Sequence, residues 1–137
     1  MRTAPEIHQA MVDAAMSRDF AALRAVYHDD YTYTAPDGVE RRGIEAAVEV
    51  VETYISAFPD FAVSIERQYQ PSDDVSIMEF RATGTHRAEL DGIAATNKRV
   101  EFRGVNIVEI HGERIVRERE YYDNLAIMHQ LGAAETR

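Results

Sequence analysis

The chain has 137 residues, 45% of them hydrophobic, which is enough to bury one core, and we expect a single domain over residues 1–137. Its 24 acidic residues against 15 basic ones give a formal net charge of −9, which disfavours nucleic acid and anionic membranes as partners. There is no cysteine, which excludes disulfides, thiolate nucleophiles and zinc sites built on thiolates. The N-terminal stretch MRTAPEIHQAMVDAAM lacks an uninterrupted apolar run, so we expect no signal peptide or membrane span and a cytoplasmic protein.

The first half of the chain predicts three helices and one strand. Residues 6–16 place Ile7 and Met11 on one helical face, and Asp19 can cap a second helix whose apolar residues extend to Tyr27. The segment YTYTAPDG (31–38) alternates and then ends in a turn, which predicts a strand. Residues 44–58 have helical periodicity, and Pro59 ends that helix.

Four strands are predicted in the second half, over residues 61–70, 75–88, 99–110 and 114–123. The joins PSDD and HGE are short and polar, as hairpin loops are, and the longer LDGIAATNK has the glycine and asparagine that favour a loop. An antiparallel sheet with helices on one face must curl around them. The sequence therefore predicts an α+β cone, a curved antiparallel sheet wrapped around three N-terminal-half helices, with a pocket inside.

The alternation of side chains along the strands indicates which of them point into this pocket. Apolar residues share a face with His86 in strand 75–88 and with Asn106 in strand 99–110, so we expect both side chains to point inward. Strand 114–123 is ambiguous, because its arginines share a face with Asp123 and its glutamates share the other with Tyr122. One bulge would exchange the two faces, so alternation alone does not orient Asp123.

Four segments together resemble the SnoaL-like polyketide and ester cyclases of the NTF2-like superfamily. They are AFPDF (57–61), GTHRAELDGI (84–93), KRVEFRGVNIVEIHGERI (98–115) and YYDNLAIMHQLG (121–132). The resemblance implies an α+β cone and an intramolecular aldol reaction that closes a ring without cofactor or metal. It also implies that Asp123 is the acid/base, because this residue matches the position of the family's aspartate. A carboxylate in an apolar pocket has a raised pKa, which suits proton transfer near neutral pH.

The chain departs from the family at one position. The characterised cyclases carry a histidine where Asn106 stands here, and an amide can donate a hydrogen bond to an oxyanion but cannot transfer a proton. His86 is a candidate to replace that histidine. The related steroid isomerases have an aspartate where this chain has Ala35, which makes isomerase chemistry a poorer match.

Each candidate also has a structural interpretation. Asp123 can cap a short terminal helix, His86 can be a core histidine with satisfied hydrogen bonds, and Asn106 can tie down the end of a strand. The tyrosines can be core aromatics. Residues 28–30 (HDD) suggest a metal, but consecutive loop residues converge poorly on an ion, and we expect none.

We therefore expect Asp123, His86 and Asn106 as catalytic residues acting on a small hydrophobic carbonyl compound. The side chains expected to contact this substrate are Tyr33, Tyr54, Phe58, Met78, Phe80, Phe102 and Tyr121. The alternatives are a binding module that has lost its chemistry and a dimerisation domain that uses the outer sheet face. Arginines and glutamates on that face favour a polar interface, and the superfamily resemblance implies a homodimer.

Overall fold

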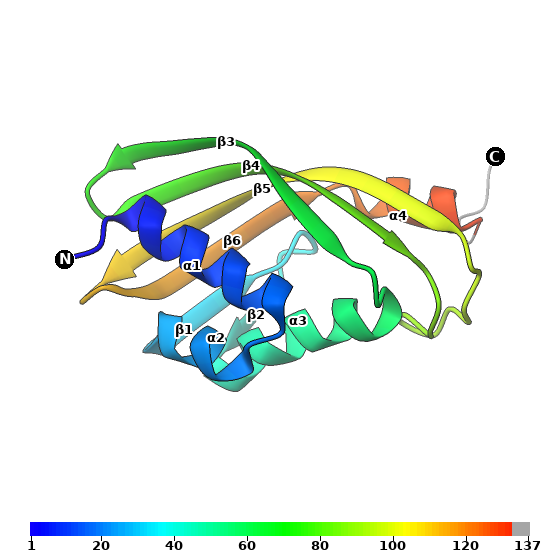
Figure 1. Cartoon of the computed structure of the whole chain (residues 1–137), viewed down its shortest axis with the longest axis horizontal. Coiled ribbons are helices and arrows are strands. Elements are labelled where there is room, and N and C mark those ends of the chain that lie inside the picture. The colour runs from blue at the N-terminus through cyan, green and yellow to red at the C-terminus, as the bar shows by residue number, and fades with distance from the viewer. Residues whose placement is uncertain (133–137) are drawn as a thin grey trace.

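The computed structural model describes residues 1–132. In this part of the chain four helices and six strands follow one another, namely α1 (Ala4–Ser17), α2 (Phe20–Val26), β1 (Tyr27–Thr34), β2 (Glu40–Arg42), α3 (Ile44–Ala57), β3 (Ala62–Ser72), β4 (Val75–Thr85), β5 (Arg99–His111), β6 (Arg114–Tyr122) and α4 (Asn124–Leu131). Helices α1, α2 and α3 lie against one face of a curved sheet, and α4 lies at the far end of that sheet (Figure 1). The predicted α+β cone is confirmed.

The six strands form one open sheet in the order β2-β1-β6-β5-β4-β3. The pairs β3–β4, β4–β5, β5–β6 and β1–β2 are antiparallel, whereas β1 and β6 are parallel. The sheet is thus mixed rather than antiparallel throughout. Strand β1 lies beside the last strand, and after β2 helix α3 carries the chain across to β3 at the opposite edge.

Local sequence signals set the ends of the helices. Thr3 and Glu6 form a capping box at the start of α1, and Pro5 occupies the first turn, where its missing N–H has no cost. Asp19 accepts a hydrogen bond from the Ala22 amide at 3.0 Å and so caps α2, as the sequence predicted. Helix α2 ends at Val26, one residue earlier than expected, because Tyr27 is already extended and pairs with Ile115.

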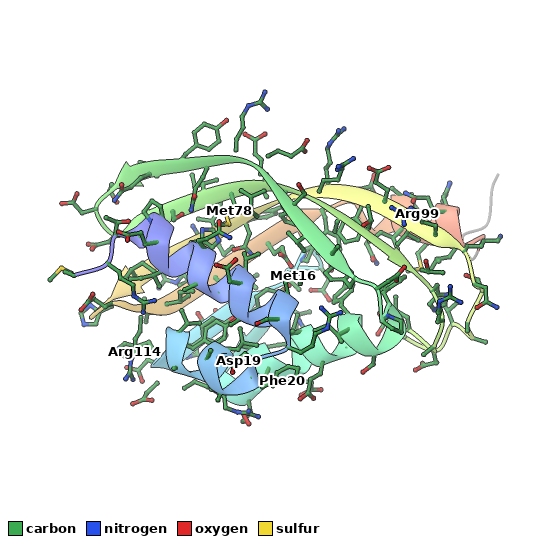
Figure 2. The ribbon with its side chains drawn as sticks, in the orientation of Figure 1. Met16, Asp19, Phe20, Met78, Arg99 and Arg114 are labelled. Atoms are coloured by element: carbon green, nitrogen blue, oxygen red, sulfur yellow. The ribbon has the colours of Figure 1, made fainter. Side chains whose placement is uncertain are left out.

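The alternation predicted for β4 and β5 is confirmed by burial. Met78, Phe80 and Ala82 of β4 are buried while Arg81 is exposed, and β5 buries Phe102 and Asn106 in the same way. Met78 of β4 and Met16 of α1 both lie where the sheet faces the helices (Figure 2). Residues of this inner face line the candidate site.

One bulge decides which face of β6 points inward. Ile110 of β5 pairs with Ile115, but the preceding Glu109 pairs with Arg117, so Val116 is an extra residue in β6. Beyond this bulge, Glu118 and Glu120 take the same side of the sheet as Val108 and Asn106, with which they pair. Arg117 and Arg119 therefore point outward, where both pair with Glu109.

Gly104 of β5 lies in close contact with neighbouring atoms of the sheet. A Cβ atom at this position would lie 2.5 Å from Cζ of Phe80 and 2.7 Å from the carbonyl oxygen of Tyr121. A residue without a side chain lets Phe80 pack across the strand. In the described residues, no helix is long and apolar enough to cross a membrane.

Candidate functional site

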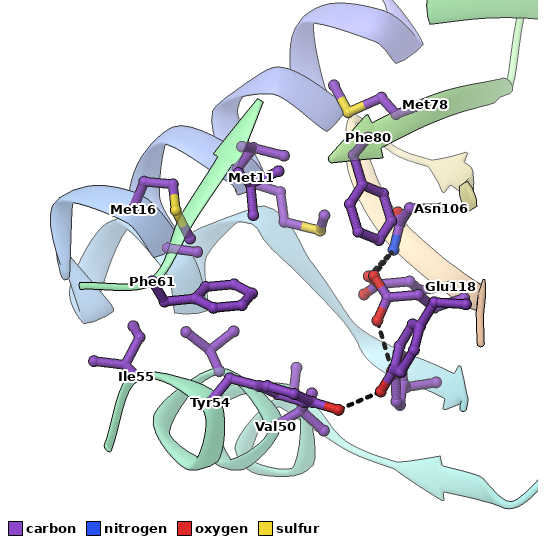
Figure 3. A pocket seen from close by; sticks show the side chains of 18 of the residues that line it. Met11, Met16, Val50, Tyr54, Ile55, Phe61, Met78, Phe80, Asn106 and Glu118 are labelled. Atoms are coloured by element: carbon purple, nitrogen blue, oxygen red, sulfur yellow. Dashed lines mark hydrogen bonds between the residues drawn. The ribbon is translucent and has the colours of Figure 1, made fainter. Parts of the chain in front are cut away.

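A cavity of about 120 Å³ lies between the inner face of the sheet and helices α1 and α3. Most of its wall is apolar and comes from methionine, valine, isoleucine and phenylalanine side chains of α1, α3, β3, β4 and β5. The polar groups gather on one side, on β1, β5 and β6, with Tyr54 facing them from α3 (Figure 3). An apolar chamber with a few convergent polar groups is the usual form of a small-molecule site.

Two carboxyl groups form the polar side of the cavity. The Asn106 amide nitrogen donates to Glu118 Oε2 at 2.7 Å and to Glu120 Oε2 at 3.0 Å, so one amide bridges the two side chains. Their other oxygens accept from tyrosines, Glu118 from Tyr31 Oη at 2.6 Å and Glu120 from Tyr33 Oη at 2.9 Å. We call Glu118 and Glu120 the carboxyl pair.

Burial raises the pKa of both carboxyl groups, and the charge of Glu118 raises that of Glu120 further. Glu118 has only 6% of its surface exposed, and burial raises its pKa above the ordinary value although Tyr31 and Asn106 donate to it. Burial and then the neighbouring charge of Glu118 raise the pKa of Glu120 to about 7, against the hydrogen bonds from Asn106 and Tyr33. Near neutral pH the pair can thus both take up and release a proton.

Two tyrosine hydroxyls form a second polar feature of the cavity. Tyr54 Oη of α3 and Tyr122 Oη of β6 are hydrogen-bonded to each other. Burial raises the pKa of Tyr54 to about 12, and burial and the neighbouring Tyr54 hold the pKa of Tyr122 well above its usual range. Both hydroxyls stay protonated, and since one hydrogen suffices for the bond between them, the other is available to a ligand.

Most residues expected to contact a substrate line this cavity. Tyr33, Tyr54, Met78, Phe80 and Phe102 do so, together with Asn106. Phe58 is fully buried instead, with its side chain against Gly84 in the core at the end of α3. Tyr121 is 52% exposed on the outer face, because alternation along β6 gives the inward position to Tyr122.

The structure does not bring Asp123 and His86 together with Asn106 in the cavity. The exposed Asp123 accepts from the Ala126 amide at 3.0 Å and caps α4, which is the helix-cap interpretation of the sequence. His86 is fully buried at the end of β4, where its Nδ1 accepts from the Thr96 amide at 3.2 Å and its ring lies 5.5 Å from that of Phe58. Neither residue lines the cavity.

The sequence interpretation missed Glu118, Glu120 and Tyr122 as site residues. The signal that could have found them is that all three lie on the same face of β6. Which face that is depends on the position of the bulge, which the sequence does not show. Within residues 1–132, no group of three or more histidine, aspartate or glutamate side chains is placed to hold a metal ion.

The sequence profile described as "SnoaL-like polyketide cyclase" matches residues 6–131. The sequence has no match among curated proteins. Several solved structures share the fold. A proposed SnoaL-like polyketide cyclase from Jannaschia sp. CCS1 superposes with a TM-score of 0.88 at 18% identity, over 96% of this chain and 93% of that one.

Two further structures extend the comparison. IdmH from Streptomyces antibioticus, a proposed polyketide cyclase, has a TM-score of 0.83 at 24% identity, over 96% of this chain and 99% of its own. A protein of ketosteroid isomerase-like fold from Catenulispora acidiphila has a TM-score of 0.79 at 21% identity, over 98% and 100% of the two chains. At these identities the likeness establishes the fold.

Proposed function

Because the chain belongs to the SnoaL-like polyketide cyclase family, we propose that it closes a ring in a small apolar carbonyl compound by an intramolecular aldol reaction, with Glu120 as the acid/base. The observation that carries the proposal is the carboxyl pair, bridged by Asn106 on one side of a mostly apolar cavity. The acid/base role moves from Asp123 to Glu120, because the carboxylate of Asp123 lies outside the cavity.

Glu120 suits the role of base better than Glu118. Glu118 is almost fully buried, whereas Glu120 is less so. Glu120 is also the member of the pair next to Tyr122 on the inner face of β6, so it lies nearer the tyrosine hydroxyls. A base of pKa about 7 takes a proton from a carbon between two carbonyls more effectively than an ordinary carboxylate does.

The tyrosine pair supplies the complementary group. Removal of the proton places negative charge on a carbonyl oxygen of the substrate, and a fixed hydroxyl donor in an apolar cavity stabilises such a charge strongly. The hydrogen that Tyr54 and Tyr122 do not need for their own bond can serve as this donor. Both tyrosines keep their protons at neutral pH, so the donor is present throughout the reaction.

The proposed reaction balances without another reactant. The C–H proton passes to Glu120, the enolate carbon forms a C–C bond to a second carbonyl of the same molecule, and the resulting alkoxide takes the proton back from Glu120. The product is an isomer of the substrate. The chamber favours this by holding the two ends of the substrate close to each other.

The cavity size limits the substrate. Its volume of about 120 Å³ is near the roughly 150 Å³ of an engineered apolar cavity that binds benzene. We therefore propose a substrate that folds to about the size of one ring. A second candidate function is binding without turnover, favoured because all four oxygens of the carboxyl pair already accept hydrogen bonds from the protein.

Hydrogen–deuterium exchange tests the first chemical step directly. Compounds with a 1,3-dicarbonyl unit and a further carbonyl would be incubated with the protein in D₂O, and NMR would follow both exchange at the activated carbon and ring closure. Glu120→Gln should slow both by about 10²- to 10⁴-fold. Glu52→Gln, which removes an exposed carboxylate from α3, is the matched control and should change neither rate.

Two results would overturn the assignment. If Asp123→Asn abolishes exchange and Glu120→Gln does not, the acid/base is Asp123. If compounds bind in the cavity but exchange no faster than in buffer, the chain is a binding module.

A further inference from the structure

A fully buried histidine lies behind the carboxyl pair. His8 is on α1, has no exposed surface and does not line the cavity. Its Nε2 lies 2.7 Å from Oδ1 of Asn106, and its Nδ1 lies 2.8 Å from Oγ of Ser76 on β4. His8 therefore contacts the amide that bridges the pair without lining the cavity itself.

The chemistry of these groups fixes the direction of each hydrogen bond. The Asn106 amide nitrogen donates to both Glu118 and Glu120, so its oxygen, which can only accept, faces His8. The Nε2 atom of His8 must then carry the hydrogen, which leaves Nδ1 to accept from the Ser76 hydroxyl.

The chain of donors begins at Gln68 on the edge strand β3. Ser76 Oγ itself accepts from Gln68 Nε2 at 3.3 Å, and Gln68 also donates to the Pro5 carbonyl at 3.0 Å. Every bond from Gln68 through Ser76, His8 and Asn106 thus points its hydrogen toward the carboxyl pair. A series of aligned hydrogen bonds strengthens each member.

His8 carries no charge at neutral pH. Burial lowers its pKa to about 4, although the hydrogen bond to Asn106 opposes this shift. The groups that surround the carboxyl pair are tyrosines, Tyr27, Tyr31 and Tyr33 from β1, Tyr54 from α3 and Tyr122 from β6, and burial raises the pKa of each. The pair is therefore held by neutral donors, and their orientation matters.

We propose that His8 is a positioning residue for ring closure: by holding the oxygen of Asn106, it keeps both amide hydrogens on the carboxyl pair and so keeps Glu120 available as a base. This inference rests on the proposed function for its link to catalysis. Without His8, the Asn106 oxygen loses its buried donor, and rotation of the amide would direct that oxygen at the carboxylates. The pair would then hold its proton more tightly.

The experiment measures the titration of Glu120 in the full chain by carboxyl ¹³C NMR, which needs no substrate. His8→Leu removes the donor, and we expect the midpoint to rise by about one pH unit. His8→Gln offers an N–H at a similar reach for the Asn106 oxygen and should restore the midpoint to within a few tenths. Gln9→Leu, an apolar replacement next along α1, is the control and should leave it unchanged.

An unchanged midpoint in folded His8→Leu would overturn the inference. If His8→Leu does not fold, Ser76→Ala tests the same chain of donors, because it removes the hydroxyl that holds His8 in the required tautomer. We expect a smaller rise in the midpoint there, and no rise would also overturn the inference. Once a substrate is known, the acidic limb of the pH profile of kcat should shift together with the titration midpoint of Glu120.

Failure of this inference is distinct from failure of the proposed function. Turnover that survives Glu120→Gln removes the reaction assigned to the carboxyl pair, whatever His8 does. A titration midpoint of Glu120 that is the same with and without His8 would rule out the positioning role, whether or not Glu120 is the base.

Discussion

Replacing Glu120 by glutamine should stabilise the folded protein above pH 7. Burial and the charge of Glu118 raise the pKa of Glu120 from 4.5 to about 7, so the folded chain binds this proton more tightly than the unfolded chain. Such a group contributes stability that is fully present below pH 4.5 and lost as the pH rises through 7.

The magnitude follows from the size of the shift. The difference of 7 − 4.5 = 2.5 pH units, at about 1.4 kcal/mol per unit, corresponds to at most about 3 to 4 kcal/mol. Glutamine carries no charge at any pH, and it can keep an oxygen on the Asn106 amide while its nitrogen faces the Tyr33 hydroxyl. The variant should therefore keep most of the packing, and its free energy of unfolding should lack most of the pH dependence that Glu120 contributes.

Urea unfolding followed by circular dichroism, at intervals from pH 4.5 to 8.5, measures the effect. The free energy of unfolding of the wild type should fall more steeply with pH than that of Glu120→Gln, and the curves should separate mainly between pH 5 and 8. Glu52→Gln should follow the wild type. Parallel curves for Glu120→Gln and the wild type would refute the raised pKa and with it the reason for choosing Glu120 as the base.

Two further predictions concern the frame around the cavity. Asp123→Ala should lower the free energy of unfolding by about 1 kcal/mol, while Asp123→Ser should cost little, because a hydroxyl can also accept from the Ala126 amide; equal losses in a urea titration would contradict the cap. Gly104→Ala should cost about 1 to 3 kcal/mol, since the new methyl group would meet Phe80 and the Tyr121 carbonyl. A thermal melt that shows no loss would mean that the strand can shift to make room.

The order of helices and strands was predictable because the signals for it are local. The caps at Asp19 and the stop at Pro59 act on their own helices, and the alternation in β4 and β5 identified Asn106 as an inward residue. The resemblance to the SnoaL-like family agrees with the profile match over residues 6–131. These features need no knowledge of distant contacts.

The acids of the cavity were not predictable in the same way. Glu118 and Glu120 follow a bulge, and a bulge depends on how β6 packs against β5 rather than on its own residues. His8 was hidden for a similar reason, since its partners Ser76 and Asn106 are 68 and 98 residues away in the chain. Asp123 was expected to be the acid/base because it matches the position of the family's aspartate, but its carboxylate caps the N-terminus of α4.

The single extra residue at Val116 determines which side chains of β6 face the cavity, and so determines the chemistry of the cavity. Pairing without the bulge would turn Arg117 and Arg119 inward and Glu118 and Glu120 outward. The same strand would then line the cavity with cations in place of acids. A strand of alternating charge beside a bulge can thus present either an acidic or a basic face to the cavity, depending on its pairing. In such a fold, the gain or loss of one residue can reverse the kind of ligand that is favoured, with every other strand left in place.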